Sequence, residues 1–298
     1  MKGVLLMAKK KKSGRIAVPF LITVFLGLLI VGGGAYAVYK YFGLGNEQEL
    51  KEPAPRVVAT TSYEDSHTIL LILDEPDLKC SSTFVLMRSI PKDKKLMFLG
   101  LPTNMITVID GVQRSLAGSY KGGGVSAAKE FIEIVFGITI DRYMKFDGAA
   151  LIKACDMVGG VNYPVKVQMS GFNSDGSEQY LSGQEIEKFI TYSMFDEGEV
   201  QRAYIASSVI SDMVNQADGK RLADGLDNSF NTIINMVDSD ITAVDYKKRK
   251  TAIKNMLSRG ESVSRFLTMD GSNADADFIP SEGFIKNIVE EYFEVKTG

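Results

Sequence analysis

Three short apolar runs within residues 68–102, TILLILDEPDLKCSSTFVLMRSIPKDKKLMFLGLP, decide the fold of this chain. Residues 68–74, 82–88 and 95–101 are rich in aliphatic side chains and are each of strand length, with proline-containing breaks between them. The turn-forming sequence at residues 91–94 predicts a hairpin between the second and third runs. We therefore expect these runs to be buried strands at the centre of a sheet.

Segments with helical spacing follow and alternate with further strands. Residues 126–136 (SAAKEFIEIVF) carry apolar side chains on one helical face and stop before Gly137, a residue typical of helix ends. Further helices are predicted at 149–158, 184–191, 199–216, 225–237, 246–259 and 281–293, and strands at 143–147, 161–169 and 263–269. This alternation predicts an α/β fold, a three-layer α/β/α domain with a mixed central sheet and helices on both faces.

The overall composition is that of an ordinary globular protein, but the charges are unevenly distributed. The 298 residues are 45% hydrophobic and 24% charged, with 34 Lys+Arg against 37 Asp+Glu and a net charge of −3. Six of the basic residues lie within residues 1–15, which hold no acid, so the rest of the chain has 28 basic groups against 37 acidic ones. Such a composition excludes a collagen-like repeat, a disordered acidic tail and, with only two cysteines, a disulfide scaffold.

A continuous apolar run follows the basic end. Residues 18–39 contain no ionisable group except two tyrosines, and 22 residues at about 1.5 Å each span about 33 Å, enough to cross a bilayer core. A cleaved signal peptide is the alternative, because residues 35–37 (Ala-Tyr-Ala) resemble a cleavage site, but the run is longer than the apolar core of such peptides. We therefore predict a transmembrane helix at residues 16–42.

The basic residues before this helix predict its orientation. Under the positive-inside rule, residues 1–15 form a cytoplasmic segment of a single-pass cell-membrane protein, and everything after the helix lies outside the cytoplasm. Residues 43–61 are polar and contain two prolines, as expected for a stalk or linker. The remaining residues, 62–298, are predicted to form one extracytoplasmic domain.

Local motifs offer little support for a metal site, a nucleotide site or a disulfide. His67 is the single histidine and has no cysteine nearby, so we expect it to be exposed or capping. Cys80 and Cys155 could pair outside the cell, but their separation favours free thiols. We predict an acidic turn rather than a calcium loop at residues 270–277. The glycines at residues 122–124 are not followed by the Gly-Lys-Ser/Thr of a phosphate loop. Nucleic-acid binding is disfavoured, because the only basic run lies beside the predicted membrane helix.

Several motifs taken together resemble the LytR-CpsA-Psr domain. They are residues 69–74 (ILLILD), 82–87 (STFVLM), 101–102 (LP), 114–123 (RSLAGSYKGG), 136–143 (FGITIDRY), 146–148 (FDG), 158–161 (VGGV) and 181–183 (LSG), followed by Arg202. The likeness covers residues 62–295 and is most specific at 114–161. It implies a membrane-anchored envelope enzyme that transfers a glycopolymer from a polyprenyl-pyrophosphate carrier to peptidoglycan. Arginines and carboxylate-held Mg²⁺ would then stabilise the pyrophosphate, and an apolar tunnel would hold the lipid.

This sequence departs from the family pattern at three motifs. The family's Arg-Ser-Asp-Thr stands here as residues 80–83 (Cys-Ser-Ser-Thr), so Ser82 replaces the metal-binding aspartate. Its Pro-Arg-Asp-Thr stands as residues 102–105 (Pro-Thr-Asn-Met), without the arginine and its carboxylate neighbour. Its Arg-x-x-Arg-Gln begins here with Glu199, an acid that would repel a pyrophosphate, and keeps only Arg202. Each lost group of this kind commonly contributes about 3 kcal/mol, on the order of a hundredfold in rate.

The departures predict a retained fold with an eroded active site. The residues expected to contact a phosphate or lipid head group are Arg202, Arg114, Lys121, Ser82, Thr83, Thr103 and Asn104; no catalytic residue or metal ligand is assigned, and Mg²⁺ is implied only if the chain is a transferase. The main hypothesis is a non-catalytic envelope protein that binds a polyprenyl-linked precursor, a wall glycopolymer or a sister envelope protein. The alternatives are an active phosphotransferase or pyrophosphatase with a rearranged site, and a structural or sensory ectodomain.

Overall fold

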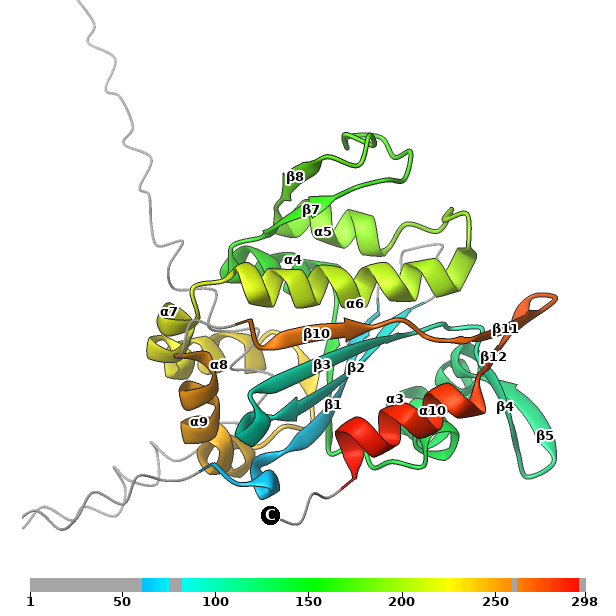
Figure 1. Cartoon of the computed structure of the whole chain (residues 1–298), viewed down its shortest axis with the longest axis horizontal. Helices are drawn as coiled ribbons and strands as arrows, with labels where there is room; N and C mark the ends of the chain where they lie inside the picture. Colours follow the sequence, from blue (N-terminus) through cyan, green and yellow to red (C-terminus); the bar gives the residue numbers. More distant parts are fainter. Residues whose placement is uncertain (1–60, 75–81, 259–261, 295–298) are drawn as a thin grey trace, which may run out of the picture.

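A mixed sheet of six strands forms the centre of the molecule (Figure 1), and the computed structural model describes residues 61–74, 82–258 and 262–294. The strand order is β10-β3-β2-β1-β6-β9. Neighbours are antiparallel except for the parallel pairs β1–β6 and β3–β10. The strands are β1 (His67–Leu73), β2 (Thr83–Ile90), β3 (Lys95–Leu101), β6 (Arg142–Phe146), β9 (Asp238–Ser239) and β10 (Ser264–Leu267). The three strands predicted from residues 68–102 and the hairpin between the second and third are thus confirmed.

Two apolar cores lie on opposite faces of this sheet. Along β1, Ile69 and Leu71 enter one core while Leu70 and Ile72 enter the other, because successive side chains of a strand alternate between faces. The first core also contains residues of α4 (Gly148–Val158), α5 (Gly183–Ile190), α6 (Gly198–Gln216), α7 (Gly219–Asp224), α8 (Leu226–Ile234) and α9 (Ala243–Leu257). The second contains residues of α3 (Leu116–Phe136), α10 (Glu282–Ile288) and the π-helical turn η4 (Val289–Phe293). The predicted α/β class with helices on both faces of a mixed sheet is confirmed.

Helix α3 differs from its prediction. It begins at Leu116, ten residues before the expected start, and ends before Gly137 as predicted. The three glycines at 122–124 therefore lie inside the helix, where Gly124 has a φ of 63° and produces a kink. The first turns of this helix were not predicted because they contain several glycines, which have low helix propensity.

Three two-stranded hairpins were not predicted as such. They are β4–β5 (Ile106–Ile109, Val112–Ser115), β7–β8 (Val161–Pro164, Glu178–Leu181) and β11–β12 (Gly271–Ala274, Asp277–Pro280). The strand expected at 161–169 stops at Pro164, since proline has no N–H to continue the ladder. The acidic turn expected within residues 270–277 is confirmed as the tip of β11–β12, where Asp275 has a φ of 56°.

Predictions about single residues have different outcomes. The expectation of an exposed or capping His67 is wrong: it is 2% exposed as the first residue of β1, with Nδ1 3.1 Å from the carbonyl oxygen of Asp65. Cys155 is buried in α4 as a free thiol whose pKa is raised by burial, while Cys80 lies outside the described residues. The predicted membrane helix at 16–42 also lies outside them, and no helix in the described ranges is long and apolar enough to cross a bilayer.

Candidate functional site

The candidate site lies at one end of the central strands, where β1 ends, β2 begins and β3 ends. The antiparallel registers Leu73↔Thr83 and Phe84↔Leu101 bring these three strand ends to one edge of the sheet. Helix α6 crosses this edge in direct contact with β3. A Cβ atom added at Gly100 would lie 1.8 Å from the carbonyl oxygen of Ala203, so only glycine permits the approach. The next residue toward the start of the helix is Arg202.

Arg202 is 2% exposed and lies against the beginning of β2. Its Nη1 donates to Thr83 Oγ1 at 2.6 Å, and its Nη2 donates to the backbone carbonyl of Ser82 at 3.3 Å. A buried guanidinium needs such acceptors, because burial of an unpaired charge is costly. Two of the predicted site residues, Ser82 and Thr83, are therefore hydrogen-bond partners of a third.

Glu199 provides the negative charge that balances Arg202. Arg202 Nε donates to Glu199 Oε1 at 3.1 Å, and Nη2 contacts Oε2, so the pair is bidentate and joins residues one helical turn apart. The buried hydroxyl of Thr103 also donates to Glu199 Oε2. From the sequence alone Glu199 was expected only to repel a pyrophosphate; its spacing of three residues from Arg202 was the signal for an internal ion pair.

A second polar cluster adjoins the first through Ser82. Ser82 Oγ donates to Asp74 Oδ1 at 2.9 Å, and Tyr120 Oη, from α3, donates to Asp74 Oδ2 at 2.7 Å. Lys145 Nζ lies 3.9 Å from Asp74 Oδ2. Burial raises the pKa of the Tyr120 hydroxyl, and its hydrogen bond to Asp74 raises it further. Asp74 and Tyr120 were not among the predicted site residues, although a carboxylate at the end of a buried strand is a usual position for a functional group.

The other predicted site residues point elsewhere. Asn104 Nδ2 donates to the carbonyl of Ala276 at 2.7 Å, so this side chain ties the strand-end loop to the β11–β12 hairpin. Arg114 is exposed on β5, and Lys121 is exposed on α3 one residue after Tyr120. Of the seven predicted residues, the structure connects Ser82, Thr83, Thr103 and Arg202 through one hydrogen-bond network.

The described residues do not fit the Mg²⁺ ion that the family resemblance implied. Within residues 61–74, 82–258 and 262–294 no three His, Cys, Asp or Glu side chains are grouped so as to hold a metal ion. Each carboxylate of the site already has hydrogen-bond donors: Glu199 has Arg202 and Thr103, and Asp74 has Ser82 and Tyr120. Mg²⁺ binds through carboxylate oxygens, which are here already committed to other donors.

Comparison with known proteins gives a family match over most of the chain. The LytR_cpsA_psr family model matches residues 44–289. A Bacillus cereus protein named polyisoprenyl-teichoic acid–peptidoglycan teichoic acid transferase TagU is 28% identical over 156 residues, which cover 48% of this chain and 51% of that protein. The chain thus spans about half the length of that relative. The Bacillus subtilis protein of the same name is 21% identical over 267 residues, covering 83% of this chain and 86% of its own.

Solved structures share the fold. A Eubacterium siraeum protein described as a transcription regulator superposes with a TM-score of 0.68 at 19% identity, over 82% of this chain and 98% of its own. The crystal structure of Bacillus subtilis TagU superposes with a TM-score of 0.54 at 18% identity, over 78% of this chain and 99% of its own. The sequence resemblance is therefore confirmed, and this chain belongs to the LytR_cpsA_psr family.

Proposed function

We propose that this protein is a membrane-anchored, extracytoplasmic component of cell-envelope assembly that does not catalyse phosphotransfer. Its relatives are named as transferases that join polyisoprenyl-linked teichoic acid to peptidoglycan, which supports a role in glycopolymer attachment to the wall. The observation that carries the non-catalytic part is the Arg202–Glu199 pair. In this chain a carboxylate holds the one arginine retained from the family motif.

The charge of the site argues against stabilisation of a pyrophosphate. Glu199 neutralises Arg202, and Asp74 lies 3.9 Å from Lys145, so neither cation offers an unopposed positive charge. Electrostatic stabilisation of developing charge commonly contributes most to such catalysis, with about 3 kcal/mol for one well-placed group. An incoming phosphate would have to displace Glu199 from a bidentate pair before it could contact the guanidinium.

The test of this proposal is turnover of a lipid pyrophosphate. The purified full chain is incubated with farnesyl pyrophosphate and Mg²⁺ or Mn²⁺, and phosphate release is compared with Bacillus subtilis TagU as the reference and with Arg202→Ala of this chain. We expect wild type and Arg202→Ala to release phosphate equally slowly. Metal-dependent release that Arg202→Ala abolishes would instead establish the alternative, an active transferase or pyrophosphatase with a rearranged site.

The non-catalytic role that we propose is the binding of a polyprenyl-linked precursor, with wall glycopolymer or a sister envelope protein as its further partners. The family match and the names of the relatives support this ligand class. Mass spectrometry of lipids extracted from the membrane-purified protein measures it directly. Enrichment of polyprenyl phosphates over a mock purification is expected, and a lipid profile identical to the mock would contradict the proposal.

We test the orientation of the membrane anchor proposed at residues 16–42 by cysteine labelling. With the basic end inside the cell, a single cysteine placed in the stalk at residues 43–61 reacts with a membrane-impermeant maleimide in intact cells, in a chain whose Cys80 and Cys155 are replaced by serine. A cysteine placed within residues 1–15 reacts only after lysis. The reverse labelling pattern would refute the orientation.

A further inference from the structure

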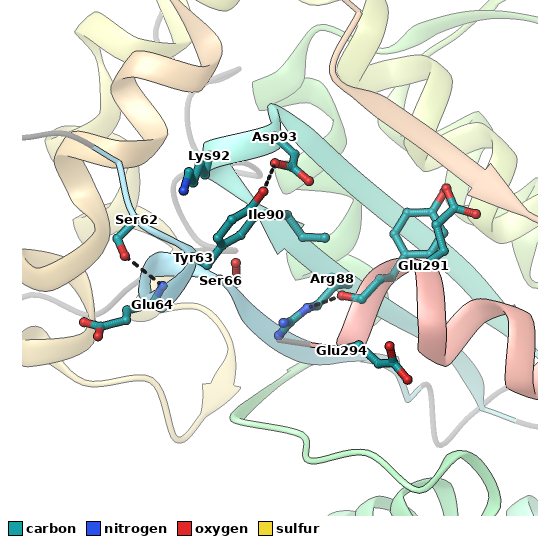
Figure 2. A pocket seen from close by; sticks show the side chains of 11 residues that line it. Ser62, Tyr63, Glu64, Ser66, Arg88, Ile90, Lys92, Asp93, Glu291 and Glu294 are labelled. Carbon is teal, nitrogen blue, oxygen red and sulfur yellow. Dashed lines mark hydrogen bonds between the residues drawn. The ribbon is translucent and has the colours of Figure 1, made fainter. Parts of the chain in front are cut away.

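A cavity of about 360 Å³ lies at the opposite end of β1 and β2 from the Arg202 site (Figure 2). It is lined by the 3₁₀ turns η2 (Tyr63–Asp65) and η3 (Pro91–Asp93), the end of β2 and the turn η4. Its basic residue in β2, Arg88, is five residues from Thr83, or about 17 Å along a strand. The cavity is thus separate from the candidate site around Arg202.

Arg88 is a half-buried cation that forms no ion pair with any residue that the structure describes, although the nearby charge of Asp141 favours its protonated form. Its Nε donates to the carbonyl of Tyr292 at 3.1 Å and its Nη1 to Thr68 Oγ1 at 3.1 Å, while its guanidinium lies 5.2 Å from the centre of the Phe293 ring. It forms no ion pair with any Asp or Glu in the described parts of the chain, and its Nη2 donates no hydrogen bond there. Burial lowers the pKa of this guanidinium, and the charge of Asp141 opposes that shift only in part. Five N–H donors with only two in use leave the side chain able to bind a planar anion.

A hydroxyl group in the cavity wall also lacks a partner. Ser66 Oγ is buried and has no hydrogen-bond partner within the described residues. Ser66 and Arg88 both line the cavity, and in Figure 2 Arg88 lies between Ser66 and Glu294. Buried hydroxyls are normally hydrogen-bonded, so the Ser66 hydroxyl can donate to a group that enters the cavity.

The other charged residues of the wall limit which anion the cavity can take. Glu64 and Glu294 are exposed, and their carboxylates form no hydrogen bond or ion pair in the described ranges. Glu291, by contrast, lies 3.8 Å from Lys95, and the second wall cation, Lys92, lies over the Tyr63 ring at 4.1 Å. In Figure 2 Glu294 lies on the Arg88 side of the cavity, whereas Glu64 lies away from it beside Ser62. An unpaired carboxylate in the same wall repels a phosphate dianion and attracts an ammonium group.

We propose that this cavity binds a small zwitterion, an amino acid or short peptide, with its carboxylate on Arg88 and its ammonium group on Glu294. The volume accommodates a ligand of this size, since small-molecule sites begin at about 300 Å³. Ser66 donates to the same carboxylate as Arg88. Such a ligand gives a partner to the guanidinium, to the buried hydroxyl and to the carboxylate beside them.

The experiment is calorimetric titration of the full chain in detergent with alanylalanine and two blocked forms of it. N-acetyl-alanylalanine lacks the ammonium group, and alanylalanine amide lacks the carboxylate. We expect alanylalanine to bind at least tenfold more tightly than either blocked form, and inorganic phosphate not to compete. Equal binding of a blocked form, competition by phosphate, or no binding of alanylalanine would each overturn the proposal.

Variants assign the binding to this cavity. Glu294→Gln removes an exposed carboxylate and should weaken alanylalanine binding severalfold, while the weak binding of N-acetyl-alanylalanine stays unchanged because that ligand has no ammonium group. The matched control is Glu290→Gln, which removes the same charge four residues earlier from a residue outside the cavity wall. Equal alanylalanine binding by these two variants would refute the ammonium site.

Arg88→Gln tests the carboxylate site and should abolish binding. Because Arg88 also holds η4 through the carbonyl of Tyr292, the fold of this variant is checked by thermal unfolding. If Arg88→Gln unfolds, the comparison of Glu294→Gln with Glu290→Gln decides the question. A folded Arg88→Gln that binds alanylalanine as tightly as wild type would overturn the proposal.

Discussion

Replacement of Glu199 by glutamine tests whether this carboxylate balances the buried charge of Arg202. The substitution keeps the size of the side chain and removes its charge, which leaves a guanidinium that is 2% exposed with only neutral partners. Removal of one partner from a fully buried pair costs about 3–5 kcal/mol. The Glu199 side chain is 27% exposed, and glutamine can still accept one hydrogen bond, so we expect the free energy of unfolding to fall by about 2 kcal/mol.

The assay is thermal unfolding followed by circular dichroism. For a domain of this size, about 2 kcal/mol corresponds to a decrease in Tm of roughly 4–8 °C. The matched control is Glu197→Gln, which removes the same charge at the start of the same helix from an exposed residue whose side chain accepts no helix-capping hydrogen bond. We expect the control to change Tm by less than about 2 °C, since surface substitutions are usually within about 0.5 kcal/mol.

The same variant tests whether Glu199 excludes anions from the site. If the carboxylate occupies the donors that a phosphate would need, inorganic pyrophosphate should raise the Tm of Glu199→Gln but not that of wild type or Glu197→Gln. Two results would refute this reasoning. One is an equal Tm for the two variants, which would mean that the pair contributes nothing to stability. The other is stabilisation of wild type by pyrophosphate to the same extent as Glu199→Gln.

Three further predictions address the frame around the site. Gly100→Ala should prevent stable folding or lower the free energy of unfolding in chemical denaturation by more than about 3 kcal/mol, because the added Cβ would overlap a backbone carbonyl of α6. The control Gly122→Ala, whose added Cβ has nothing within 4 Å, should be neutral or stabilising by up to about 1 kcal/mol. Burial acts to raise the pKa of Asp245, but the hydrogen bonds from Arg142 and Thr242, together with the charge of Arg142, outweigh it and hold the pKa at about 2. This carboxylate therefore stabilises the fold above its unfolded pKa of about 3.9 and loses that effect as the pH falls toward 2. Asp245→Asn should therefore lower Tm at pH 7 and flatten its decline between about pH 4 and 2. Burial raises the pKa of Tyr163 to about 12, and its hydroxyl shares a buried hydrogen bond with Ser208 of α6. Tyr163→Phe removes that hydrogen bond and should lower the free energy of unfolding by about 1 kcal/mol. An unchanged denaturation midpoint would contradict this prediction.

The parts of the fold that could be predicted are those with a continuous apolar pattern. The strands around residues 68–102 are buried on both faces, so their side chains are apolar at nearly every position and the pattern is unambiguous. The exposed hairpins β4–β5 and β11–β12 carry few buried side chains, and no such pattern marks them. Their strands depend on cross-strand hydrogen bonds that residue types alone do not specify.

The candidate site was predictable where neighbouring motifs meet at strand ends. The registers of β1, β2 and β3 bring Ser82, Thr83 and Thr103 to one edge, and helix α6 places Arg202 against them. Asn104 follows Thr103 directly, but adjacent residues point in different directions and its side chain bonds the β11–β12 hairpin instead. The hydrogen bond between Asp74 and Tyr120 depends on the tertiary contact between β1 and α3, which the spacing of the sequence does not reveal.

The direct contact of α6 with β3 at Gly100 fixes the position of Arg202 through the main chain as well as through the side chains that α6 packs into the core. A helix in backbone contact with a strand cannot slide to suit a ligand without breaking that contact. The guanidinium is therefore preorganised, and a ligand that replaces Glu199 must adopt the geometry already set by Thr83 and the Ser82 carbonyl. Any gain of function at this site would come from exchange of one side chain on a rigid support, with no rearrangement of the fold.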